Sequence, residues 1–67
     1  MRHIKFLREK IKLTQAALAD KISVEQSAVS QWESGAAQPT AENLKKLATV
    51  LGCSVDEILG LTQKAKT

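Results

Sequence analysis

The side chains with the clearest chemical potential in this sequence are neutral hydrogen-bonding groups that stand close together. A glutamine amide carries an acceptor and a donor side by side, and a serine hydroxyl can donate or accept. Both kinds occur within one short stretch, at Gln26, Ser27, Ser30 and Gln31. Such groups can recognise a complementary set of donors and acceptors. Whether they face one partner together depends on the elements that hold them.

Groups that could act in catalysis or bind a metal are sparse. His3 stands near the start of the sequence, and Cys53 stands between Gly52 and a serine suited to cap a helix. We expect His3 to be solvated and Cys53 to fill space as a small packing residue. All three glycines stand at expected helix ends, so the sequence has no glycine-rich phosphate loop. We therefore expect no enzyme activity, no catalytic residue, no metal site and no cofactor.

Length and composition restrict the chain to one small domain. A chain of this size buries only about 60% of the surface that its unfolded form exposes. Leu, Ile, Val and Phe still make up 17 of the 67 residues, above the roughly 20% below which chains tend to stay disordered. No apolar run approaches a membrane span, no signal-peptide pattern is present, and a lone cysteine excludes an internal disulfide. We expect a cytoplasmic protein without membrane contact, with a domain over residues 1–61 and a short polar tail over 62–67.

The net charge of +3 is distributed unevenly along the chain. Residues 1–12 carry +4 and residues 61–67 carry +2, whereas residues 13–60 carry −3. A basic excess points to a polyanionic partner. The acidic middle of the chain argues that the contact with such a partner is not a broad basic patch.

Helical spacing of apolar residues runs through the whole sequence and predicts an all-α fold. We predict five helices, over residues 2–11, 15–22, 26–33, 41–51 and 55–59. Ile4, Leu7 and Ile11 recur on one face of the first helix. In the third helix, Val29 and Trp32 point inward. No stretch shows the sustained alternation of a strand.

Capping residues stand where these helices should begin and end. Thr14 and Thr40 are N-cap types before the second and fourth helices. The stretch 54–57 is typical of a capping box for the last helix, in which Ile58 and Leu59 should be buried. Gly35 is suited to the left-handed position after the third helix.

The second and third helices are joined by only three residues, and Ala19 is a small residue of the kind that a steep helix crossing needs. The stretch from Gln15 to Gly35 resembles the helix-turn-helix of the phage repressor/Cro family, also called the xenobiotic-response-element type. The six core positions of that pattern are occupied by Leu18, Ala19, Ile22, Val24, Val29 and Trp32. The departure is Ser23, where the family has a turn glycine; at positive φ, serine there should cost about 1 kcal/mol relative to glycine. The resemblance covers residues 4–60 and implies a five-helix, lambda-repressor-like DNA-binding domain.

By this resemblance, the partner is double-stranded operator DNA, and the second helix of the pair lies in the major groove. The exposed face of that helix should be formed by Gln26, Ser27, Ser30 and Gln31. Glutamine suits adenine, because its amide can accept from N6 and donate to N7, which discriminates by about 1–3 kcal/mol. We expect Gln26 to be the main base reader, followed by Gln31 and Ser27. The alternative is a merely solvated helix face.

Contacts to the DNA backbone are expected near helix N-termini. The residues expected to make or support them are Thr14, Gln15, Glu25, Ser34, Thr40 and Asn43. By resemblance, Gln15 touches a phosphate and holds Gln26 against an adenine. Two alanines, Ala36 and Ala37, stand where many relatives carry basic residues, and Glu25 is repelled by phosphate. We therefore expect modest non-specific affinity.

Arg8 and Glu33 are expected to serve the fold rather than the DNA contact. By resemblance, an arginine of the first helix forms a structural ion pair with the glutamate at the end of the third. If the pair is buried, removal of either partner should cost about 3–5 kcal/mol. The alternative is two solvated charges.

The resemblance further implies a regulator encoded by a bacterium or phage and associated with the nucleoid. We expect a repressor that binds a pseudo-palindromic operator as a homodimer, without a small-molecule effector. Val55, Ile58 and Leu61 are candidates for a weak dimer contact, with ordinary core packing as the alternative for the first two. Activation of transcription, a role as an antitoxin and a role as a protein-interaction module are the competing functions.

Overall fold

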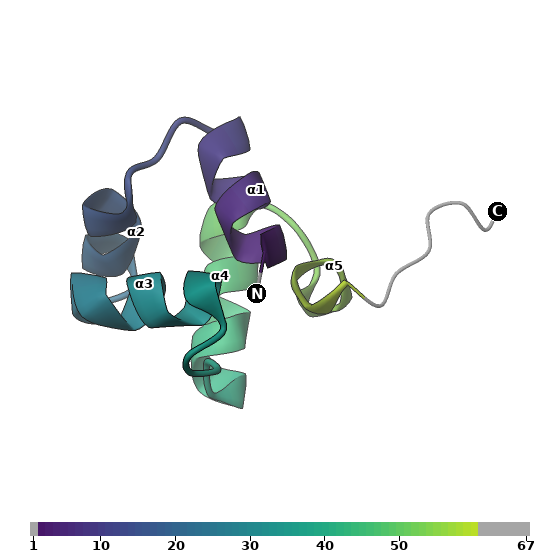
Figure 1. The fold of residues 1–67 in the computed structure, drawn as a ribbon. Helices are drawn as coiled ribbons and strands as arrows, with labels where there is room; N and C mark the ends of the chain where they lie inside the picture. The colour runs from purple at the N-terminus through teal and green to yellow at the C-terminus, as the bar shows by residue number, and fades with distance from the viewer. Residues whose placement is uncertain (1, 61–67) are drawn as a thin grey trace, which may run out of the picture.

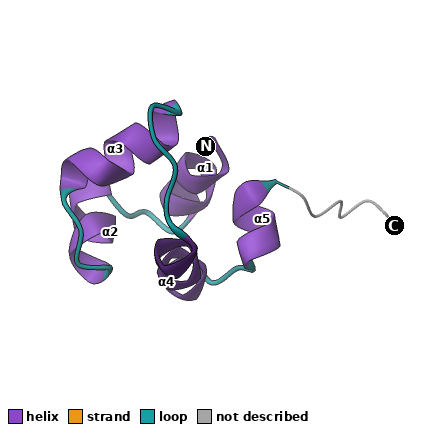
Figure 2. Ribbon diagram, turned by 90° about the horizontal axis from the view of Figure 1, so that it is seen from below, coloured by secondary structure: helices purple, strands orange, loops and turns teal. Residues whose placement is uncertain are grey.

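The computed structural model describes residues 2–60, and all regular structure in that range is helical. The helices are α1 (Arg2–Lys10), α2 (Gln15–Lys21), α3 (Gln26–Ser34), α4 (Ala41–Leu51) and α5 (Val55–Leu59). Helices α2 and α3 lie together at one end of the molecule and α5 lies at the other, with α1 and α4 between them (Figures 1 and 2). The predicted all-α class with five helices is confirmed. No helix in the described range is both long and apolar enough to cross a membrane.

Every helix contributes to one hydrophobic core. The residues that are 0% exposed come one from each helix: Ile4, Leu18, Val29, Leu47 and Ile58. Each such side chain gains about 1.5–3 kcal/mol from burial. Helix α2 packs on α3, α3 packs on α1, and α5 packs on both α1 and α4. The more extensive contacts of the α2–α3 pair with the other helices are therefore those of α3.

Local capping explains where the helices begin and end. The Thr14 and Thr40 hydroxyl oxygens each accept a hydrogen bond from the backbone N–H three residues on, at 3.0 and 3.2 Å. Ser54 and Glu57 form both hydrogen bonds of a capping box. Helices α3, α4 and α5 each end at a glycine in the left-handed conformation. These interactions satisfy backbone groups that a short helix would otherwise leave unpaired.

The turn between α2 and α3 contains a residue in the left-handed conformation, at the position where the helix-turn-helix pattern has a glycine. Ser23 has φ 60°, in the left-handed region. The backbone N–H of Val24 donates to the carbonyl oxygen of Ala19 at 3.0 Å, which closes α2. The chain thus turns sharply with a serine in a conformation that favours glycine.

Two expectations about buried apolar residues are wrong, and one candidate for the dimer contact is excluded. Helix α1 ends at Lys10, and the chain turns through Lys12 (φ 63°), so Ile11 leaves the helical face and is 42% exposed. Leu59 is 38% exposed, because α5 is one short turn whose inward position is taken by Ile58. Ile58 is fully buried and packs in the core rather than forming a dimer contact. Leu61 and the tail over 62–67 lie outside the described residues.

Candidate nucleic-acid interface

The two sides of α3 differ in chemistry. Val29 and Trp32 are 0% and 5% exposed and pack in the core. The four side chains expected to read bases are all exposed: Gln26, Ser27, Ser30 and Gln31. At 100° per residue these four fall within about 140° of the helix circumference. The outward side of α3 therefore presents two amides and two hydroxyls without an intervening charge.

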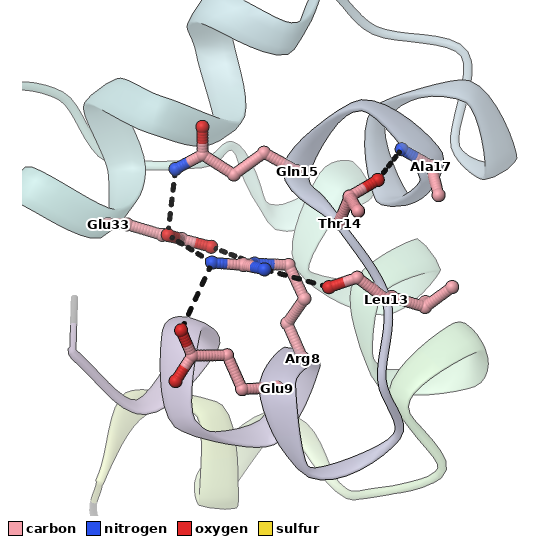
Figure 3. A network of polar contacts seen from close by, with 7 residues as sticks. All are labelled: Arg8, Glu9, Leu13, Thr14, Gln15, Ala17 and Glu33. Atoms are coloured by element: carbon pink, nitrogen blue, oxygen red, sulfur yellow. Dashed lines mark hydrogen bonds and ion pairs between the residues drawn. The ribbon is translucent and has the colours of Figure 1, made fainter.

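The start of α2 carries a second pair of polar side chains. Thr14 is the N-cap, and its Oγ1 accepts from the backbone N–H of Ala17. Gln15 follows as the first helical residue and is half-buried. Its Nε2 donates to Oε1 of Glu33 at 2.9 Å (Figure 3). The amide of Gln15 is therefore bonded to the end of α3.

Glu33 also accepts hydrogen bonds from Arg8, the partner expected from the sequence. Arg8 Nε donates to Glu33 Oε2 at 2.7 Å, and Arg8 Nη2 donates to Oε1 at 3.1 Å. The exposed fractions of the two side chains are 9% and 5%, so this is a buried, two-pronged ion pair. Arg8 Nη1 further donates to the carbonyl oxygen of Leu13 at 2.7 Å. One guanidinium thus joins α1 to α3 and to the segment that leads into α2.

The charges of this pair stabilise each other. Burial alone would raise the pKa of Glu33, but hydrogen bonds from Arg8 and Gln15, together with the positive charges of Arg8 and Lys5, hold that pKa below its ordinary value. The hydrogen bond to Glu33 raises the pKa of Arg8, against the opposing effect of burial. Glu33 is therefore ionised near neutral pH and accepts hydrogen bonds without donating any.

The remaining residues expected near the DNA backbone are distributed over three helix ends. Glu25 is the N-cap of α3, is exposed and forms no side-chain capping bond. The Ser34 hydroxyl donates to the Gln31 carbonyl oxygen at 3.2 Å and accepts a hydrogen bond from the backbone N–H two residues on. Both bonds close the end of α3. Thr40 caps α4 through the backbone of Asn43, which is half-buried. Contact of these side chains with DNA stays a prediction.

The net charge near the candidate interface is smaller than the +3 of the whole chain. Between residues 15 and 38, Glu33 is paired with Arg8, which leaves Asp20, Lys21 and Glu25 as the exposed charges. Arg8 is buried, so it does not contribute to the positive flank formed by the first twelve residues. The interface candidate is a nearly neutral surface with lysines at its margins.

The side chains that could act in catalysis or bind a metal lie as follows in the structure. Among residues 2–60, no group of three or more His, Cys, Asp or Glu side chains is placed to hold a metal ion. His3 is exposed, and its ring lies close to Gly60. Burial, and secondarily the charge of Glu57, raise the pKa of the Cys53 thiol, which disfavours a reactive thiolate.

Sequence reasoning missed the hydrogen bond from Gln15 to Glu33 and the bond from Arg8 to Leu13. The first joins residues 18 positions apart. Only the packing of α2 and α3 brings them together, so no local pattern indicates it. The second joins a side chain to a backbone oxygen five positions on, in a segment without regular structure.

Comparison with known proteins gives consistent matches to one family. The profile of a family described as "Helix-turn-helix" matches residues 4–58. The repressor protein C2 of Salmonella phage P22 is 43% identical over 56 residues, which is 84% of this chain and 26% of that protein. The HTH-type transcriptional regulator DicA of Escherichia coli is also 43% identical over 56 residues, 84% of this chain and 42% of the regulator. The cryptic phage CTXphi transcriptional repressor RstR of Vibrio cholerae is 43% identical over 53 residues, 79% of this chain and 47% of the repressor.

A solved structure matches the fold closely. The crystal structure of the P22 c2 repressor in complex with a synthetic operator has a TM-score of 0.85 and 39% identity to this chain, covering 91% of this chain and 92% of that one. The chain spans about a quarter to a half of the length of the full-length relatives described above.

Proposed function

This chain belongs to the helix-turn-helix family, and on that premise we propose that it is a sequence-specific, double-stranded DNA-binding regulator of transcription that acts as a repressor. It acts by binding rather than by catalysis, without a cofactor or effector, in the cytoplasm of a bacterium. The observation that carries the proposal is the division of α3 into a core-facing side and an outward side of neutral amides and hydroxyls. The relatives are themselves repressors and regulators, and the P22 protein is bound to an operator.

In the proposed complex, α3 enters the major groove and its exposed side faces base edges. Gln26 stands at the first turn of α3, where a side chain reaches furthest into the groove. Its amide accepts from N6 and donates to N7 of one adenine. Ser27, Ser30 and Gln31 supply shorter or more peripheral contacts.

Phosphates on either side of the groove are met by polar groups at helix starts. Thr14 and Gln15 lie at the start of α2, and Thr40 and Asn43 lie at the start of α4. These neutral groups fix the register of the protein on the duplex, whereas α3 supplies the sequence preference. Bound at a promoter, the protein represses by excluding polymerase.

The protein binds its operator as a homodimer. One module of this kind covers only about 600–1,000 Å² of DNA, which is little for high specificity. Two copies related by a two-fold axis read half-sites about one helical turn apart. With Ile58 in the core, the half-buried Val55 remains of the candidates predicted within α5, and the partly exposed Leu59 is a further apolar side chain of α5 for the contact between copies.

Selection of duplexes from a random pool tests this function directly. The purified chain should enrich a site with two-fold symmetry, at a spacing of about ten base pairs between half-site centres. Failure to enrich any site would overturn the proposal and favour a protein-interaction module. An enriched site without two-fold symmetry would retain DNA binding and overturn the dimer.

On the selected site, Gln26→Ala should weaken binding by about 1–3 kcal/mol and remove the preference for adenine at one position. The reason is the loss of one paired donor and acceptor. Competition binding against duplexes changed at each base pair measures the effect. The matched control is Gln38→Ala, which removes an exposed amide outside α3 and should leave the base preferences intact. A uniform loss on all sequences would show that Gln26 contacts a phosphate.

A further inference from the structure

The amide of Gln15 is held before any partner binds. Its Nε2 lies 2.9 Å from Glu33 Oε1, a distance typical of a charge-assisted hydrogen bond. Glutamine side chains lose about 2 kcal/mol of rotamer freedom at most when they are ordered. A glutamine already bonded within the protein has lost much of that freedom beforehand.

The acceptor that holds Gln15 is itself held by Arg8. Glu33 is bonded by both Nε and Nη2 of Arg8, at 2.7 and 3.1 Å, and its side chain is only 5% exposed. Arg8 is in turn fastened to the Leu13 carbonyl oxygen, in the segment that enters α2. The backbone before Gln15 and the side-chain partner of Gln15 are thus fixed by the same guanidinium (Figure 3).

The chemistry of the carboxylate also determines which way the amide points. An ionised carboxylate can only accept hydrogen bonds, so it binds the nitrogen of the amide and not the oxygen. In Figure 3 the Gln15 nitrogen is directed to Glu33, and the Gln15 oxygen lies on the side away from it. Oε1 and the second N–H of Nε2 stay available as one acceptor and one donor.

Arg8 also makes the arrangement compatible with a polyanion. A lone carboxylate beside a phosphate contact would repel the phosphate. Here the charge of Glu33 is compensated by a bidentate guanidinium at 2.7 Å, and Arg8 is buried with it. The carboxylate can therefore hold a DNA-contacting amide without presenting a net negative charge to the backbone.

We propose, resting on the DNA-binding function proposed above, that Glu33 is a positioning residue for DNA recognition as well as a partner in the ion pair. It fixes the amide of Gln15 in one orientation, with the nitrogen inward, so that Oε1 and the remaining N–H meet the DNA already ordered. Pre-ordering of one such side chain should strengthen binding by about 2- to 12-fold per half-site.

The first test uses the free protein and needs no DNA. In ¹⁵N-edited NMR spectra, one Gln15 Nε2 proton should exchange with water more slowly than those of the exposed Gln38, because it is held by a charged acceptor. The Glu33→Asp variant keeps a negative charge opposite Arg8 but shortens the side chain by one methylene, so we expect its hydrogen bond to Gln15 to lengthen or break. The Gln15 protons should then behave like those of Gln38. Equal exchange at Gln15 and Gln38 in the unaltered chain would overturn the proposal.

The second test measures whether Glu33 acts through Gln15. Binding to the selected duplex is compared for the unaltered chain, Glu33→Asp, Gln15→Ala and the double variant, under conditions where all four proteins are folded. Glu33→Asp should weaken binding about 2- to 12-fold when Gln15 is present and by much less when residue 15 is alanine. A loss of the same size in both backgrounds would show that Glu33 acts only through the fold and would overturn the positioning role.

The two tests separate the positioning role from the function on which it rests. If no duplex is selected, the proposed function fails and the DNA role of Glu33 fails with it, while the exchange measurement still shows whether Glu33 holds Gln15. If a duplex is selected and the effects of the two substitutions are additive, DNA binding stands and the positioning role is wrong.

Discussion

At the scale of single residues, the turn between α2 and α3 holds one of the two non-glycine residues with positive φ in the part of the chain that the structure describes. Ser23 has φ 60°, a left-handed conformation that costs an L-residue roughly 1–2 kcal/mol. Glycine removes that cost, but its greater conformational freedom stabilises the unfolded state by about 0.4–1 kcal/mol. We expect Ser23→Gly to raise the free energy of unfolding by about 0.5–1 kcal/mol, measured by urea denaturation. Ser30→Gly, inside α3, is the control and should lower it; a lower value for Ser23→Gly would contradict the argument.

At the scale of elements, the Arg8–Glu33 pair joins α1 to α3 at a buried position. Replacement of Arg8 by methionine keeps most of the apolar stem but removes the guanidinium that pairs with the buried carboxylate of Glu33. We expect the free energy of unfolding to fall by about 3–5 kcal/mol. A double variant, Arg8→Met with Glu33→Leu, should recover much of that loss because the buried carboxylate is removed together with its guanidinium partner. If the double variant is less stable than the single one, packing rather than charge accounts for the effect.

The same pair makes the link between α1 and α3 sensitive to acid. The pKa of Glu33 is lower in the folded protein than its ordinary value of 4.5. The stabilisation is therefore complete above that value and is lost as the pH falls through the lower, folded-state pKa. Arg8, whose pKa is raised, stays charged throughout. Urea unfolding should show stability declining below about pH 4.5, and Glu33→Gln should flatten this decline; an unchanged profile in the variant would assign the acid sensitivity to other groups.

The elements themselves are largely readable from the sequence because their determinants are local. Thr14, Thr40 and the 54–57 capping box act within one helical turn, and the predicted helix bounds agree with the structure to within a residue. Ile11 departs from the prediction because a left-handed Lys12 ends the helix, and a helical repeat in the sequence contains no sign of that turn.

The candidate site was predictable only in part, for the same physical reason. The outward residues of α3 follow from helix periodicity and the inward positions of Val29 and Trp32. The bond between Gln15 and Glu33 depends on how two helices cross, and Arg8 reaches Leu13 through a connecting segment. Neither contact has a signature in residue spacing.

At the scale of the whole molecule, most of the positive charge lies outside the segment 15–38 that carries the expected base-reading residues. Lys5 and Lys10 of α1 and Lys45 and Lys46 of α4 are all exposed. We expect a plot of log K against log salt to slope by only about −2 to −5 per dimer, because few cations are displaced from phosphates. Binding to the selected duplex across a salt series measures the slope. A slope near −10 would show that lysines, rather than amides and hydroxyls, dominate the contact.

Trp32 provides an intrinsic fluorescence signal that reports whether the domain is folded. It is the only tryptophan in a sequence without tyrosine, and it is 5% exposed on the inward side of α3, opposite the four polar side chains of the outward side. Its emission therefore reports the buried core and shifts to longer wavelength when the core becomes exposed to water. A variant of α3 that no longer binds DNA yet keeps the short-wavelength emission has a damaged surface. A variant that loses both has lost its fold, and one spectrum distinguishes the two.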